Sequence, residues 1–292
     1  MSHVPVPAPQ PSPYERAVWR QAQAWRNPEK GWLAQAAGAI SEAWSDVADL
    51  LCQVPGVGWT VDNVVAGLLT VVNEVCQDTV PADAICHVYR QAGHPVRHPR
   101  DIRRLDLAEV DRALAGLRGK YRALAAAEGA ATGLAGASGI VPDLVALVAL
   151  NLRATGEYAA YCGFDIAEAG ERLYALSILD HVSRSRSKAR DLALSPVLSA
   201  AGRVARRQGL QAIEQMGLTR ALERAVRMLG LRLTGAKLGQ AVPVVGAVVG
   251  SGFNAYYTDR VCRTAYHLYR ERFLFEKYGP AILQEAAPHP AA

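Results

Sequence analysis

Apolar residues recur every three or four positions along this chain, and this spacing restricts the fold more than any other feature. Near the N-terminus, for example, Ala17, Val18, Ala22 and Trp25 fall at helical intervals. Similar patterns continue to Tyr278, and one of them predicts a helix over Leu107–Leu117 that Asp106 caps. No segment combines strand-like alternation with paired turn signals. The sequence therefore predicts an all-α protein, a compact multi-helix bundle with Gly-rich apolar helical hairpins.

The composition agrees with a helical chain that buries a core. Among the 292 residues are 51 alanines, and alanine is the best helix former. Half of the residues are hydrophobic and the net charge is only +5, which excludes a disordered chain. Five scattered cysteines are too few for a disulfide framework. A helical globular or membrane-associated protein remains.

Both ends differ in composition from the middle of the chain. Residues 2–13 carry proline at every second position from Pro5, which is typical of extended polyproline II and not of a signal peptide. We therefore predict a disordered Pro-rich tail at 1–13, a single helical domain at 14–279 and a C-terminal tail at 280–292. With free cysteines and no signal peptide, the expected location is cytoplasmic, including a peripheral position at the inner face of the cell membrane.

Two segments lack charged residues, namely Gly129–Pro142 and the 21 residues from Leu238 to Thr258. The second has the length of a helix that crosses a bilayer core, about 20 residues, although Gln240 and Asn254 dilute it. A buried hairpin in a soluble core and a membrane-dipping hairpin both fit this pattern. The residues that we expect to contact a membrane or an apolar ligand are Gly129, Gly133, Gly136, Pro243, Gly246, Gly250 and Gly252.

Basic residues concentrate between His181 and Arg232, where eleven Lys and Arg face only three acidic residues. A solvated helix face explains such a run, and so does attraction to an anionic membrane surface. The stretch contains no aromatic residue on which a base would stack, so we predict no nucleic-acid partner. The expected contacts to an anionic surface are Arg184, Arg186, Lys188, Arg190, Arg203, Arg206 and Arg207.

Motifs for catalysis or cofactor binding are missing. The sequence contains no HExxH, no GxSxG and no phosphate-binding loop, and the GxGxxA match at 250–255 lacks the βαβ context of a dinucleotide site. Cys86, His87, His94 and His98 are metal-ligand types, but their spacing fits no compact zinc site. We therefore predict no catalytic residues, no cofactor and no metal.

Three polar residues remain as a candidate site: Asp143, Asn151 and Glu157. A charge at the start of an apolar helix is costly and often functional, although an acid in the first turn also stabilises a helix N-terminus. An enzyme of hydrolase type would use these side chains.

Several segments, taken in order, resemble the EcsC protein family across residues 14–279. One departure is Cys162, where the family more often has Tyr before Gly163. The segments that carry the resemblance are Trp25–Pro28, Gly31–Leu33, Glu128–Leu144, Asn151–Arg153, Tyr161–Asp165, Glu171–Leu176 and Val242–Gly246, with Asn254 and Thr258.

The resemblance implies a helical bacterial protein without an assigned catalytic mechanism, and a genomic association suggests an ABC transporter as partner. The leading hypothesis is a non-enzymatic, membrane-associated accessory protein of a transporter or of the cell envelope. One alternative is a soluble helical protein that binds an apolar ligand or lipid in a Gly-lined cavity. The second alternative is a hydrolase-type enzyme of unknown class.

Overall fold

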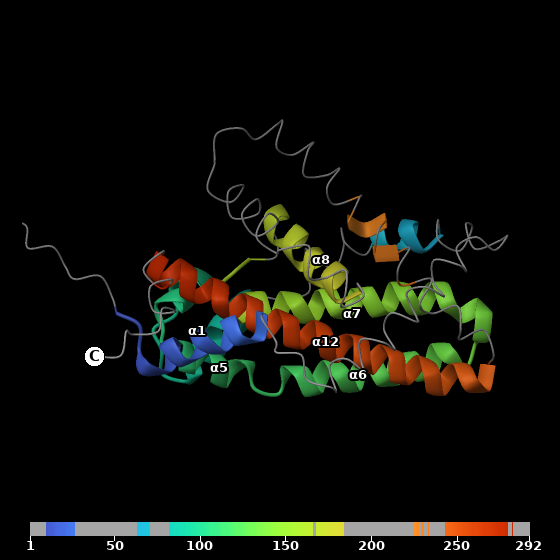
Figure 1. The fold of residues 1–292 in the computed structure, drawn as a ribbon, viewed down its shortest axis with the longest axis horizontal. Coiled ribbons are helices and arrows are strands. Elements are labelled where there is room, and N and C mark those ends of the chain that lie inside the picture. The colour runs from blue at the N-terminus through green and yellow to red at the C-terminus, as the bar shows by residue number, and fades with distance from the viewer. Residues whose placement is uncertain are drawn as a thin grey trace, which may run out of the picture.

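The computed structural model describes residues 10–26, 63–70, 82–165, 168–183, 223, 225–227, 229–230, 233, 243–279 and 282. Within these ranges the chain is helical and forms no strand, so the predicted all-α class is confirmed (Figure 1). The helices are α1 (Pro13–Arg26), α4 (Ala82–Gln91), η1 (Pro99–Arg104), α5 (Leu107–Leu114), α6 (Leu117–Gly133), η2 (Gly136–Gly139), α7 (Ile140–Tyr161), α8 (Ala169–Ser183) and α12 (Pro243–Tyr278).

The long helix α12 runs the length of the bundle and contacts most of the other helices (Figure 1). Its 36 residues extend about 54 Å at the usual helical rise. α6 is antiparallel to it, since Arg118 pairs with Asp259 whereas Glu128 contacts Asn254 further back along α12. α7 is parallel to α12 and completes a three-helix centre.

A tight turn joins α6 to α7. At Gly139 an added Cβ atom would lie 2.3 Å from the Thr132 carbonyl oxygen, so only glycine fits where the chain reverses. This turn and the first residues of α12 meet at one end of the bundle, at the right of Figure 1. The two uncharged segments are therefore neighbours in space, as far as the second one is described (243–258).

The buried side chains along one face of α6 become smaller toward this end. Leu117, Tyr121, Ala125, Gly129 and Gly133 follow one another at four-residue spacing, and all are buried. Because the first two are bulky and the last two lack a side chain, α6 can approach its neighbours most closely near the turn. Gly129 and Gly133, two of the residues predicted from the sequence to meet lipid or ligand, thus lie on the packed side of α6.

The start of α5 follows the expectation from the sequence, and its end does not. Asp106 caps the helix by accepting a hydrogen bond from the Ala108 N–H at 2.8 Å. The helix was expected to reach Leu117 but ends at Leu114, because Gly116 takes a left-handed conformation with φ of 88° and starts the turn into α6.

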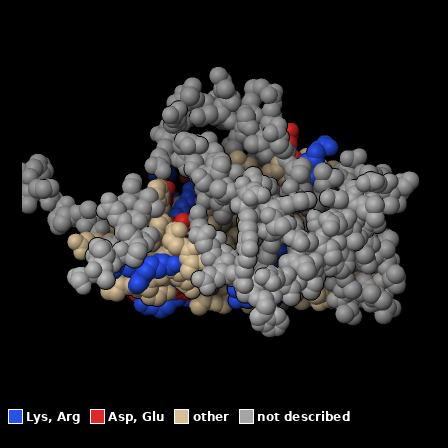
Figure 2. Space-filling view, in the orientation of Figure 1, with Lys and Arg blue, Asp and Glu red and all other residues tan. Residues whose placement is uncertain are grey.

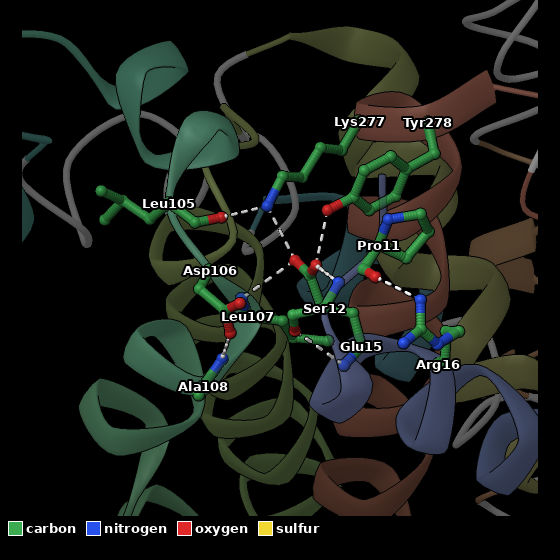
Figure 3. Close-up of polar contacts among 10 residues, drawn as sticks. All are labelled: Pro11, Ser12, Glu15, Arg16, Leu105, Asp106, Leu107, Ala108, Lys277 and Tyr278. Atoms are coloured by element: carbon green, nitrogen blue, oxygen red, sulfur yellow. Dashed lines mark hydrogen bonds and ion pairs between the residues drawn. The ribbon is translucent and has the colours of Figure 1, made fainter. Parts of the chain in front are cut away.

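A buried carboxylate attaches α1 to the rest of the bundle. Glu15 is 1% exposed and accepts hydrogen bonds from the Leu107 N–H at 3.2 Å and from Lys277 Nζ at 2.7 Å (Figure 3). The hydroxyl of Tyr278 and the Ser12 N–H donate to the same carboxylate. One side chain therefore joins α1 to the N-terminus of α5 and the C-terminal end of α12.

The far end of α1 packs on α12 through a ring stack. The indole of Trp25 lies 4.8 Å from the His267 ring, with 18° between the planes. Burial, together with the nearby charges of Arg270 and Arg263, lowers the pKa of His267 to about 4. The ring is therefore neutral in the folded protein down to mildly acidic pH.

Replacing Glu15 by Gln should lower the free energy of unfolding by about 3 kcal/mol, because the Lys277 ammonium, 13% exposed, loses its charged partner. Urea denaturation followed by circular dichroism measures this change. Glu276→Gln, an exposed acid next to Lys277, is the matched control and should cost little. Equal stabilities for the two variants would contradict the assigned role of Glu15.

The His267→Gln variant should flatten the decline of stability in acid. In the unfolded chain His267 takes up a proton near pH 6.5, whereas in the folded protein it does so only near pH 4. The free energy of unfolding therefore falls as the pH drops between these values, and the variant lacks this contribution. Unfolding curves from pH 7.5 down to 4 test this, with the exposed His87→Gln as control. Parallel curves for His267→Gln and wild type would refute it.

Candidate functional site: a buried polar cluster among α6, α7 and α12

Two carboxylates and one amide meet at the core of the three-helix centre. Asn254 is fully buried, and its Nδ2 donates to Glu128 Oε2 at 2.6 Å and to Asp143 Oδ1 at 2.9 Å. Thr132 Oγ1 also donates to Asp143 Oδ1 at 2.6 Å. Because carboxylates only accept when ionised, the nitrogen of the Asn254 amide must face them. One side chain of α12 thus binds α6 and α7 together.

A second amide joins α7 to α12, two helical turns further along α7 and one turn further along α12. Asn151 Nδ2 donates to Thr258 Oγ1 at 3.0 Å and to the Leu147 carbonyl at 2.8 Å. Both Asn151 and Thr258 are fully buried. Asn254 and Thr258 are four residues apart and Asp143 and Asn151 eight, so each pair lies on one face of its helix.

The side-chain oxygens of both amides in this cluster are unsatisfied. The Oδ1 atoms of Asn151 and Asn254 are buried and have no hydrogen-bond partner among the described residues. Leaving a buried acceptor unpaired costs about 1–3 kcal/mol. The cluster is therefore a costly feature of the core and not a neutral filling of space.

The third candidate from the sequence, Glu157, lies elsewhere. It accepts from Tyr121 Oη at 2.7 Å and from Lys120 Nζ at 3.0 Å, and Arg153 approaches at 3.9 Å. Burial and the bond to Glu157 raise the pKa of Tyr121. The structure thus places Asp143 and Asn151 along one polar row and Glu157 in a separate network at the α6–α7 surface.

Sequence reasoning did not select Glu128, Thr132, Asn254 or Thr258 as site residues. A usable signal was present, because Asn254 and Thr258 are polar residues at helical spacing within an uncharged run. That run was interpreted as an apolar segment diluted by polar residues. The missing information was the partner, since Glu128 and Asn254 are 126 residues apart.

The geometry of the cluster suits a structural role better than a catalytic one. Asp143 is 1% exposed, and its first-turn position directs the carboxylate to Thr132 and Asn254. His94, one of the metal-ligand types, pairs with Glu109 at 3.0 Å. Within the described ranges, no group of three or more His, Cys, Asp or Glu side chains is arranged to hold a metal ion.

The structure describes only some of the other residues that were predicted to contact a membrane, an apolar ligand or an anionic surface. Gly136, Pro243, Gly246 and Gly250 lie in helical backbone at the uncharged end, and Gly252 is exposed, with open space where a Cβ would stand. In the part of the chain that the structure covers, no helix combines the length and the hydropathy needed to span a membrane. Seven predicted contacts to an anionic surface lie outside the described residues: Arg184, Arg186, Lys188, Arg190, Arg203, Arg206 and Arg207.

Asn254→Asp should destabilise the protein strongly at pH 8, by about 3 kcal/mol or more, because it adds a third carboxylate beside Glu128 and Asp143. The penalty should shrink as the pH falls toward 5, since the carboxyl group that the substitution adds is then able to take up a proton. Chemical denaturation at both pH values measures it. Ser251→Ala, half-buried on the same helix, should show neither effect. A penalty that does not change with pH would rule out the carboxylate contacts.

Comparison with known proteins gives one result. No curated protein and no solved structure matches the chain. The model of the EcsC protein family matches residues 16–274, nearly all of the predicted helical domain and every element from α1 to most of α12. Since the match covers far more than half of the sequence, this chain belongs to the EcsC protein family.

Proposed function

We propose that this protein is a non-enzymatic, membrane-associated accessory protein that meets lipid through the uncharged end of its bundle. The uncharged end comprises residues 129–142 and 243–258. The observation that carries the proposal is the convergence of these two segments, more than a hundred residues apart in sequence, on one end of the molecule (Figure 1).

The exposed side chains of this end suit a shallow position at a lipid surface. Leu134 is 67% exposed at the turn after α6. Pro142 and Ser138 are also exposed, and no side chain of the uncharged end carries a charge. The nearby carboxylates, Glu128 and Asp143, are directed inward to Asn254.

The non-enzymatic part of the proposal is supported by the buried cluster. Asp143 is 1% exposed and accepts hydrogen bonds from Thr132 and Asn254. The basic residues of 184–232 would add attraction to anionic headgroups, at about 1 kcal/mol for each Lys or Arg near the surface. An ABC transporter is the kind of membrane partner that the family's genomic association suggests.

Flotation with liposomes tests the proposal. The protein should float with anionic vesicles at low salt and should retain part of this binding at high salt, because the uncharged end is insensitive to screening. Leu134→Asp should reduce the bound fraction by roughly five-fold at high salt, since it places a charge in the contact region.

Leu124→Asp is the matched control, because Leu124 is 47% exposed on the same helix. It lies ten residues before Leu134, which corresponds to about 15 Å along α6. Its flotation should equal that of the wild type. Protein that stays at the bottom under every condition would refute the membrane role and favour an apolar ligand in a Gly-lined cavity.

A further inference from the structure

A second surface of the molecule is strongly basic. Between Asp83 and Leu105 the chain carries five arginines and two acids, Asp83 and Asp101. Arg90 lies in the last turn of α4 and donates to the Val96 carbonyl at 3.2 Å, and the other four arginines lie in or beside η1. The exposed members beside η1 form the arginine surface: Arg97, Arg100 and Arg104.

The backbone beneath the arginine surface is firmly held. Val96 and Ile102 are buried to 1% and 0% exposure and anchor the segment in the core. The Asp101 carboxylate accepts from the Arg97 N–H at 3.1 Å and the His98 N–H at 2.9 Å. These bonds lower the pKa of Asp101 and hold its charge against the backbone. The exposed arginines therefore project from a fixed frame.

The remaining arginine of the group is part of this frame. Arg103 Nε donates to the Gly163 carbonyl at 2.9 Å, and its guanidinium lies 4.5 Å from the centre of the Phe164 ring. Gly163 has a φ of 78° and leaves no room for a side chain, since a Cβ there would lie 2.7 Å from the Pro99 carbonyl oxygen. η1 is thus fixed against the end of α7.

The outward arginines are weakly neutralised. Their side chains are 74% exposed at Arg100 and 86% at Arg104. Arg100 approaches Glu168 only to 4.0 Å and Arg104 approaches Asp101 only to 3.9 Å, the limit of an ion pair. Such exposed contacts contribute little, about 0–1 kcal/mol. The guanidinium groups are therefore accessible to an anionic partner.

The position of the arginine surface separates it from the uncharged end. η1 contacts the C-terminal end of α7, whereas the uncharged end includes its N-terminus. The 22 residues of α7 put about 33 Å between them. With the uncharged end at the headgroups, the arginine surface lies several Debye lengths of about 8–10 Å from the lipid. Figure 2 shows Lys and Arg side chains at the α1–α5 end of the molecule.

The chemistry of the surface favours carboxylates over nucleic acid. No Phe, Tyr or Trp occurs between Arg90 and Arg104, so the stretch lacks the large aromatic side chains on which bases usually stack. η1 has six residues and is too short to fill a groove of duplex DNA. The planar guanidinium group pairs with a carboxylate through two parallel hydrogen bonds, and a fixed backbone keeps several such groups in register.

We propose that the arginine surface docks an acidic segment of a protein partner, a run of Asp and Glu side chains, on the side of the molecule that faces away from the membrane. The orientation rests on the proposed function, whereas the docking itself does not require lipid.

The test uses the full chain and a fluorescein-labelled peptide of about a dozen Asp and Glu residues. Fluorescence anisotropy should show binding that weakens with salt. The Arg97→Ala, Arg100→Ala, Arg104→Ala triple variant should bind about ten-fold more weakly, a loss of ~1.4 kcal/mol. The matched control removes the same charge from three exposed arginines elsewhere, Arg20, Arg122 and Arg263, and should stay within about two-fold of the wild type.

Two further arms separate this inference from the proposed function. The triple variant should float with anionic vesicles as well as the wild type does. Loss of flotation in the triple variant would mean that the arginines meet lipid, and would overturn the inference. Equal peptide binding by the triple and the control variants, or tighter arginine-dependent binding of a duplex DNA, would also overturn it. Peptide binding by a protein that never floats would leave the docking surface standing and remove the membrane role.

Discussion

The fold depends on one repeated interaction: polar side chains of α12 donate hydrogen bonds to buried or half-buried carboxylates on the helices around it. Lys277 reaches Glu15 on α1, Arg270 reaches Asp111 on α5 at 2.8 Å, and Arg272 reaches Glu171 on α8. Asn254 does the same for α6 and α7 through Glu128 and Asp143. The donors lie on one helix, and the acceptors lie on five others. Apolar contacts in the core are non-directional, and these directional pairs fix which helix lies where and in what register.

The cost of burying these groups shows in their pKa values. Burial raises the pKa of Glu171 and of Asp111 even though an arginine faces each of them. A misplaced helix would leave such a carboxylate without its donor, which is far more costly than shifting one alanine against another. We infer that the polar pairs contribute specificity for this one arrangement more than net stability.

The sequence predicted the class of the fold because helical spacing is a local property. The Asp106 cap was found for the same reason, since an N-cap and its N–H partner are two residues apart. The neighbours of each helix were not predictable. Glu15 and Lys277 are 262 residues apart, and periodicity identifies a buried face without naming what covers it. Asp143 was selected as unusual, but its partners on α6 and α12 needed the structure.

The late position of α12 in the sequence affects how the chain folds during its synthesis. Every carboxylate that it satisfies is translated before it, so α1, α5, α6, α7 and α8 leave the ribosome with acceptors whose donors do not yet exist. Contacts of such long sequence separation slow folding, because a large loop must close before they form. The bundle therefore completes its core only after the last long helix emerges, and a nascent chain that stops before α12 presents paired apolar and acidic surfaces to the chaperones of the cell.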